Sequence, residues 1–120
     1  MSFREILQDM VERVDGSLGA VIMGYDGISI DEYIKTGVDL DVPILSIEYG
    51  TLLKEIKNTI DLLKTGDMEE IVISTGLSKV IIRPVTDDFF VVYVLKESGN
   101  FGMARYLIKK DAQRIALELQ

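Results

Sequence analysis

The stretch that decides the fold is SLGAVIMGYDGISIDEYI, residues 17–34. It predicts a β-hairpin, because its centre is Asp26-Gly27 and tight hairpin turns need the positive φ that Gly and Asp tolerate. The first arm, residues 18–23, is small or apolar at every position, whereas the second arm alternates. One face of the second arm is expected to carry Ile28, Ile30 and Ile34, and the other face Ser29 and Asp31.

Hydrophobic periodicity predicts three helices and three further strands around this hairpin. The first helix follows Ser2, which forms a capping box with Glu5, and ends at residues 15–16. A second helix begins at Pro43 and ends at residues 65–67. Strands are expected at residues 70–75, 79–85 and 89–96, and a last helix follows Asn100. The predicted order of elements is α-β-β-α-β-β-β-α.

The two strands that are apolar on both faces determine the predicted sheet order. Short turns join the last three strands, so these should form an antiparallel meander. Residues 89–95 are as uniformly apolar as residues 18–23, and placing the two side by side gives the order 2-1-5-4-3. The second arm of the hairpin then becomes an outer edge, where charges such as Asp31 discourage further pairing. The expected fold is α+β, with one domain over residues 1–120, a five-stranded antiparallel sheet and helices on both faces.

The composition excludes several classes of function. A net charge of −7 and a pI near 4.5 argue against nucleic acid and anionic membranes as partners. The absence of Cys and His excludes disulfides and thiolate zinc sites, and removes the commonest general base. No phosphate-binding loop is present, and the acidic residues do not have the spacing of a calcium loop. We therefore expect a cytoplasmic protein without catalytic residues, cofactor, metal site or membrane span, and without nucleotide hydrolysis of its own.

Two arginines, Arg83 and Arg105, are candidates for chemistry in trans on a phosphate, of the kind that arginine fingers provide. The simpler expectation is that both arginines have structural rather than catalytic roles. Arg83 is expected on a strand face, paired with a carboxylate, and Arg105 is expected to be a solvated residue of the last helix.

The strand at the other edge of the sheet is short, apolar and free of charge and proline inside it. Such an edge is prone to aggregation unless something protects it. Two features could prevent aggregation at this edge. The first is the shortness of the strand together with the adjacent Glu69-Glu70, and the second is pairing with the same strand of a second copy. We predict the second, a homodimer. Its interface is expected to contain Ile71, Val72, Ile73, Ser74 and Thr75, together with Ile47 and Thr51 of the second helix.

The second helix carries apolar residues outside its expected core stripe. That stripe consists of Leu45, Tyr49, Leu52, Leu53, Ile56, Ile60 and Leu63. At about 100° per residue, a separate outward ledge contains Ile44, Ile47, Thr51 and Leu62, and Gly50 is also placed on the outward side. Single exposed apolar residues are normal on protein surfaces, so the ledge indicates either a partner surface or ordinary exposure.

Within this order of elements, local motifs resemble the Roadblock/dynein light chain family, most closely its bacterial members that partner small Ras-like GTPases. The motifs are Gly19-Ala20-Val21-Ile22 followed by Asp26-Gly27, then Ile47-Glu48-Tyr49, and finally the opening of the last helix, NFGMAR at residues 100–105. The resemblance covers essentially the whole chain. It implies a Roadblock/profilin-like fold and homodimers built through the third strand and the second helix.

The resemblance also implies a function, which is docking of a small Ras-like GTPase onto a dimeric regulator or scaffold. It leaves open whether docking stimulates GTP hydrolysis. The docking surface is expected to be a composite groove between the two second helices, around Ile47, Thr51, Lys54, Glu55, Asn58 and Leu62. Arg114, on the last helix across the sheet, is expected to be replaceable without effect.

The alternative function is a small-molecule sensor, because an α+β sheet with a helix-covered face can hold a ligand pocket. That interpretation needs a cavity between sheet and helix, lined by small residues such as Gly19, Ala20 and Gly24.

Overall fold

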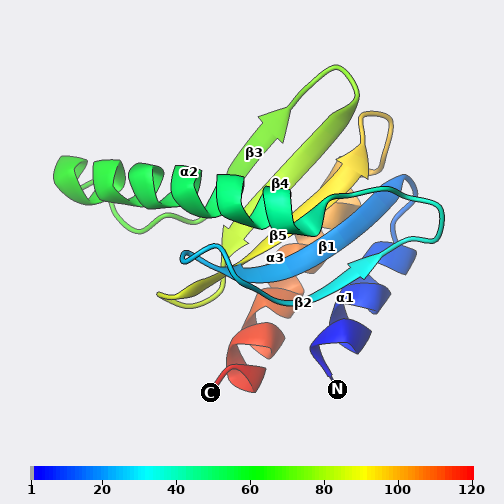
Figure 1. Cartoon of the computed structure of the whole chain (residues 1–120), viewed down its shortest axis with the longest axis horizontal. Coiled ribbons are helices and arrows are strands. Elements are labelled where there is room, and N and C mark those ends of the chain that lie inside the picture. Colours follow the sequence, from blue (N-terminus) through cyan, green and yellow to red (C-terminus); the bar gives the residue numbers. More distant parts are fainter. Residues whose placement is uncertain (1) are drawn as a thin grey trace.

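The computed structural model describes residues 2–120. Its elements are α1 (Phe3–Glu12), β1 (Ser17–Gly24), β2 (Ser29–Ile34), α2 (Val42–Leu63), β3 (Ile71–Ser74), β4 (Ser78–Pro84), β5 (Phe89–Lys96) and α3 (Phe101–Glu118). The strands form one antiparallel sheet in the order β2-β1-β5-β4-β3, which confirms the predicted fold. Helices α1 and α3 cover one face of the sheet, and α2 crosses the other (Figure 1).

Side chains cap the three helices, at the predicted positions Ser2 and Asn100 and at Asp41, which was not predicted as a cap. The Ser2 hydroxyl accepts a hydrogen bond from the Glu5 N–H, and the Glu5 carboxylate accepts one from the Ser2 N–H, so the capping box forms. Asp41 caps α2, with Pro43 in its first turn, and Asn100 caps α3. These caps satisfy backbone N–H groups that a helix leaves unpaired at its start. None of the helices in residues 2–120 is long and apolar enough to cross a membrane.

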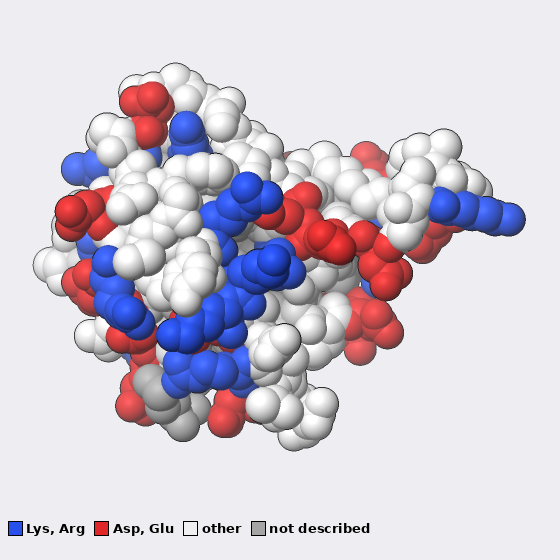
Figure 2. Space-filling model, turned by 180° about the vertical axis from the view of Figure 1, so that it is seen from behind, with Lys and Arg blue, Asp and Glu red and all other residues white. Residues whose placement is uncertain are grey.

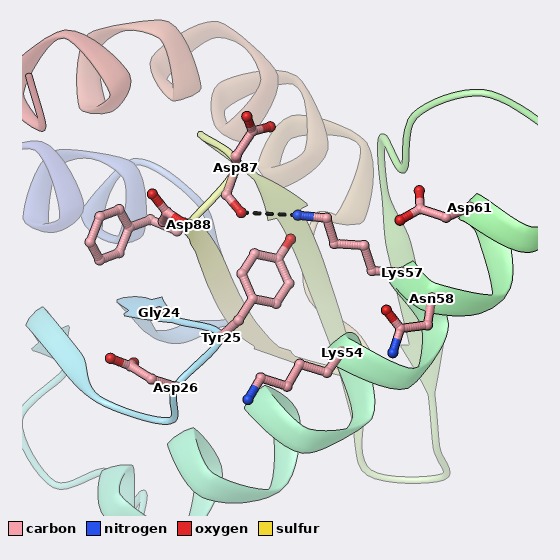
Figure 3. A pocket seen from close by; sticks show the side chains of 10 residues that line it. Gly24, Tyr25, Asp26, Lys54, Lys57, Asn58, Asp61, Asp87 and Asp88 are labelled. Atoms are coloured by element: carbon pink, nitrogen blue, oxygen red, sulfur yellow. Dashed lines mark hydrogen bonds between the residues drawn. The ribbon is translucent and has the colours of Figure 1, made fainter.

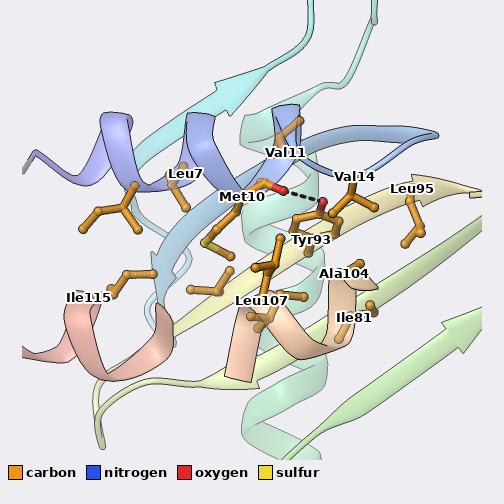
Figure 4. Packing of buried hydrophobic residues seen from close by; sticks show 14 of the residues in the cluster. Leu7, Met10, Val11, Val14, Ile81, Tyr93, Leu95, Ala104, Leu107 and Ile115 are labelled. Carbon is orange, nitrogen blue, oxygen red and sulfur yellow. Dashed lines mark hydrogen bonds between the residues drawn. The ribbon is translucent and has the colours of Figure 1, made fainter. Parts of the chain in front are cut away.

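The sheet separates two hydrophobic cores. On the α1/α3 face, Met10, Tyr93 and Leu107 belong to one fully buried cluster (Figure 4). On the α2 face, Leu53 and Phe90 belong to the other. Strands β1 and β5 contribute to both clusters, because they lie between the two helical layers and bury both of their faces. This two-sided burial is the physical basis of their central position.

Tyr93 is a buried polar group whose hydroxyl is fully used. It donates a hydrogen bond to the Met10 carbonyl at 3.0 Å and also bonds the Ser17 hydroxyl, which links β5 to the end of α1 and the start of β1. Burial raises the pKa of Tyr93 to about 12, because the phenolate would lose its hydration in this core.

We expect alkaline pH to destabilise the fold through Tyr93. The pKa of Tyr93 is higher in the folded than in the unfolded protein, so the neutral phenol favours the folded state below pH ~10. As the pH rises from ~10 to ~12, about 2–3 kcal/mol of the free energy of unfolding is lost. Denaturant unfolding at a series of pH values measures it. Tyr93→Phe should be less stable by about 1–3 kcal/mol at neutral pH, since Met10 and Ser17 lose their partner, and should show a shallower alkaline decline. An unchanged alkaline decline in this variant would contradict the assignment.

The alternation predicted for the second hairpin arm is interrupted. Ile22 pairs with Asp31 but the next residue, Met23, pairs with Ser29, so Ile30 is an extra residue on β2. A β-bulge of this kind shifts the side chains that follow it. Ile34 packs against the α2-side core, whereas Ile28 and Ile30, which were predicted to share its face, are exposed.

Candidate partner-binding surface

The N-terminal half of α2 is seated on the β1–β2 turn by close backbone packing. A Cβ atom added to Gly50 would lie 3.2 Å from the Cα of Gly27, so only glycine fits without displacement. The Gly50 position was predicted to face outward, and this prediction is wrong, because Gly50 is buried together with Ser46. A glycine in a helix interior costs about 1 kcal/mol relative to alanine, and this contact with the turn offsets that cost.

We expect Gly50→Val to destabilise the protein by about 1–3 kcal/mol, because the branched side chain would push α2 off the turn. Chemical denaturation measures the free energy of unfolding. The matched control is Gly76→Val, at a glycine whose added Cβ would have no neighbouring atom within 4 Å. Equal destabilisation in both variants would show that the Gly50–Gly27 contact is not what holds α2.

The C-terminal half of α2 extends beyond the sheet (Figure 1). Leu52 and Leu63, which were predicted to lie in the core stripe, are 39% and 67% exposed. The reason lies in the tertiary structure. Because Gly50 packs on the β1–β2 turn, α2 is rotated relative to the predicted orientation, and its predicted core stripe no longer faces the sheet throughout. In addition, the last turns of α2 have no strand beneath them. Leu53, in contrast, is fully buried. The result is an apolar flank on α2, consisting of Leu52 and Leu63.

The residues predicted to contact a GTPase do share one exposed face. At about 100° per residue they fall within roughly a quarter of the helix circumference. Ile47 and Leu62 are the apolar members, 58% and 82% exposed. This surface, which we call the α2 ledge, consists of Ile47, Thr51, Lys54, Glu55, Asn58 and Leu62, all exposed. The apolar flank lies beside the ledge, farther around the same helix.

A cleft of about 530 Å³ separates α2 from the β1–β2 and β4–β5 turns (Figure 3). The Lys57 ammonium donates to the Asp87 carbonyl at 3.0 Å and lies 4.7 Å from the centre of the Tyr25 ring. Burial, with a smaller contribution from the Asp87 charge, raises the pKa of Tyr25 above its ordinary value. Sequence reasoning did not find this cleft, because its walls come from three separate segments. The lining is Gly24, Tyr25, Asp26, Lys54, Lys57, Asn58, Asp61, Asp87, Asp88 and Phe89.

Of the small residues named for a ligand cavity, Gly19 and Ala20 do not line one, whereas Gly24 lies in the wall of the cleft beside α2. Ala20 is fully buried, and a Cβ at Gly19 would lie 2.6 Å from the Cδ1 of Ile34. At Gly24 the same position is 2.7 Å from the Asp26 carboxylate. Other side chains therefore fill the space beside Gly19 and Ala20, and the Asp26 carboxylate, which also lines the cleft, lies against Gly24. Residues 2–120 also contain no group of three or more carboxylates placed to hold a metal ion.

The edge strand β3 is one residue shorter than predicted at each end. Thr75 lies in the following turn, where its N–H donates to the Ser78 carbonyl at 2.9 Å. This bond places alternate residues, Ile71 and Ile73, in hydrogen-bonded pairs with β4. The backbone N–H and C=O groups of Val72 and Ser74 therefore point away from β4, toward the open edge.

The three arginines singled out from the sequence have different environments. Arg105 is not simply solvated, because its Nε lies 2.8 Å from the Glu70 carboxylate. Arg83 was expected to pair with a carboxylate, and no such ion pair forms within residues 2–120. Arg114 lies 3.1 Å from the carboxylate of Asp111, which is almost fully buried. Removing Arg114 would leave a buried charge without this partner, so the structure argues against its being freely replaceable.

The burial of Asp111 is a feature that the sequence could have indicated. Asp111 falls in the apolar spacing of α3, between Ile108 and Ile115, where a charged residue must be satisfied internally. An arginine three residues later is the natural partner.

The architecture defines a class of protein. A Roadblock/LC7 domain from Streptomyces avermitilis superposes with a TM-score of 0.86 at 13% identity, covering 99% of this chain and 98% of that one. MglB from Myxococcus xanthus gives 0.84 at 13% identity, with the same coverages of 99% and 98%. The fold is therefore the Roadblock/LC7 fold.

A relative much more similar in sequence identifies the family. MglC from Myxococcus xanthus is 36% identical, over 98% of this chain and 99% of that one, with a TM-score of 0.72. This chain belongs to the Roadblock/LC7 family, as its motifs predicted. No family model matches the sequence. A search of curated proteins also finds no match.

Proposed function

We propose that this protein is a homodimeric regulator or scaffold that binds a small Ras-like GTPase in the cytoplasm. The observation that carries the proposal is the α2 ledge, whose apolar ends, Ile47 and Leu62, are both more than half exposed. An apolar surface with a charged rim suits a transient complex in which a few central residues carry most of the binding energy. Membership of the Roadblock/LC7 family supports a GTPase as the partner.

The dimer in this proposal uses the edge strand β3 and the apolar flank of α2. Outward N–H and C=O groups on β3 can pair with a second copy about a two-fold axis. Leu52 and Leu63 supply exposed apolar area on α2. The interface should bury on the order of 1,200–2,000 Å² in total. The proposed dimer interface differs from the one predicted from the sequence in two ways. Leu52 and Leu63 are added to it, and Ile47 and Thr51 contribute chiefly to the GTPase-binding groove between the α2 ledges of the two copies.

The protein is proposed to act without a catalytic residue of its own. Any stimulation of GTP hydrolysis would come from remodelling the GTPase's own loops, as the resemblance implies, rather than from an arginine inserted in trans. Arg105, one of the two candidate arginines, is held in an ion pair with Glu70.

Calorimetry with a Ras-like GTPase encoded near this gene tests the proposal. We expect binding to the GTPase loaded with a non-hydrolysable GTP analogue, and weaker binding to the GDP form. A single-turnover assay with and without this protein then separates stimulation of hydrolysis from scaffolding. Absence of binding in both nucleotide states would contradict the proposal, and a small molecule retained in native mass spectrometry would favour the sensor alternative.

A further inference from the structure

A second groove lies on the opposite face of the sheet, between the end of β4 and α3. It consists of two adjoining hollows, of about 440 and 250 Å³, which share Arg83 and Lys109. Strand β3 pairs with β4 only from Lys79 to Ile82. The residues of β4 after Ile82 therefore extend past the edge strand.

The groove is positively charged although the chain is acidic. Neither Arg83 nor Lys109 has an ion-pair partner within residues 2–120, and the smaller hollow contains no acidic residue. The larger hollow also contains Glu69 and Glu70, and Arg105 binds the Glu70 carboxylate at 2.8 Å. The three cations of the groove, Arg83, Arg105 and Lys109, outnumber these two carboxylates. Lys and Arg gather on this face of the molecule (Figure 2), whereas the net charge of the chain is −7.

Most of the remaining lining of the smaller hollow is apolar. Val85, Ala112 and Ala116 line the smaller hollow, and Tyr106, more than half exposed, lies at the larger one. Two unpaired cations beside small apolar side chains suit a chain that presents carboxylates and apolar side chains together. An aromatic side chain at the rim is also typical of protein-binding surfaces.

We propose that this groove binds an acidic segment of a partner protein. A long polyanion such as RNA, or an anionic membrane, would be repelled by the acidic remainder of the surface. A short segment avoids most of that repulsion, because charges beyond about 8 Å are largely screened at physiological ionic strength. The groove lies across the sheet from the α2 ledge, so a GTPase and an acidic partner could be bound at the same time. The proposal does not depend on the identity of the α2 partner.

An NMR titration with a defined probe tests this inference. The probe is a twelve-residue peptide with the repeat Glu-Glu-Leu, added to uniformly ¹⁵N-labelled protein at near-physiological salt. We expect amide shift changes concentrated at Arg83, Val85, Lys109 and Gln113. The double variant Arg83→Glu/Lys109→Glu should weaken binding by at least about tenfold, because two charge-assisted contacts are lost.

The control variant is Lys35→Glu/Lys64→Glu, which makes the same change in net charge at positions after β2 and after α2. It should bind the peptide within about twofold of the unmodified protein, since distant charges are screened. Equal weakening in both double variants would overturn the groove assignment. Equally tight binding of a Lys-Lys-Leu peptide, of a twelve-nucleotide RNA or of phosphatidylserine vesicles would overturn the choice of an acidic protein segment. GTPase affinity, measured on the same variants, should stay unchanged.

Discussion

Replacement of Ile73 by lysine is expected to convert the proposed dimer into a monomer. In the proposed two-fold pairing of β3 with its copy, the outward backbone groups of Val72 and Ser74 bond across the interface. Ile73 then lies opposite Ile73 of the other copy, in a non-hydrogen-bonded pair with Cα atoms about 4.5 Å apart. Two lysines at that distance would repel each other and remove apolar contact.

Light scattering at tens of micromolar protein measures the mass of each variant. Because Ile73 also packs against the α2-side core, a second variant separates the dimer from the fold. Ser74→Pro removes an outward N–H and leaves the bonds between β3 and β4 in place, since the Ser74 backbone points away from β4. Thermal unfolding should report a folded monomer for Ser74→Pro.

The matched control is Ile30→Lys, the same substitution on the opposite edge strand, β2, at an exposed position. It should remain a dimer. The interface assignment fails if the unmodified protein is already monomeric, or if Ile73→Lys and Ser74→Pro both stay dimeric. Dissociation by Ile30→Lys alone would place the interface on β2.

Thr51→Arg is expected to reduce GTPase affinity by about 100-fold or more. Thr51 lies near the centre of the α2 ledge, is exposed, and its hydroxyl donates only to the Ile47 carbonyl of the same helix at 3.0 Å. Its replacement should therefore leave the fold intact. A long charged side chain at the centre of the docking surface would block close approach, and central positions of interfaces commonly contribute 2 kcal/mol or more.

Calorimetry with the GTP-like form of the GTPase measures this loss. The control is Lys110→Glu, at an exposed position of α3 across the sheet, which replaces Arg114 as a control because Arg114 is tied to the buried Asp111. Light scattering must show that Thr51→Arg is still a dimer. Unchanged binding by Thr51→Arg together with lost binding by Lys110→Glu would place the GTPase on the opposite face.

The sequence by itself determined the elements and their order in the sheet. Helix starts at Ser2 and Asn100 follow from caps that bond within a few residues. The hairpin turn at Asp26-Gly27 is also local, with Gly27 at a φ of +83°. The uninterrupted apolar composition of β1 and β5 indicates that both faces of each strand are buried. This made the order of strands in the sheet predictable from the sequence of one chain.

Only the tertiary structure decided how α2 is rotated and where it leaves the sheet. Its periodicity is compatible with more than one core-facing stripe, and the contact of Gly50 with Gly27 selects between them. Leu52 and Leu63 are exposed because the sheet ends before the helix does, and a helix pattern carries no information about the width of the sheet beneath it. The position of Arg83 beyond the paired part of β4 depends in the same way on where β3 ends, so the basic groove appears only when strand and helix are placed together.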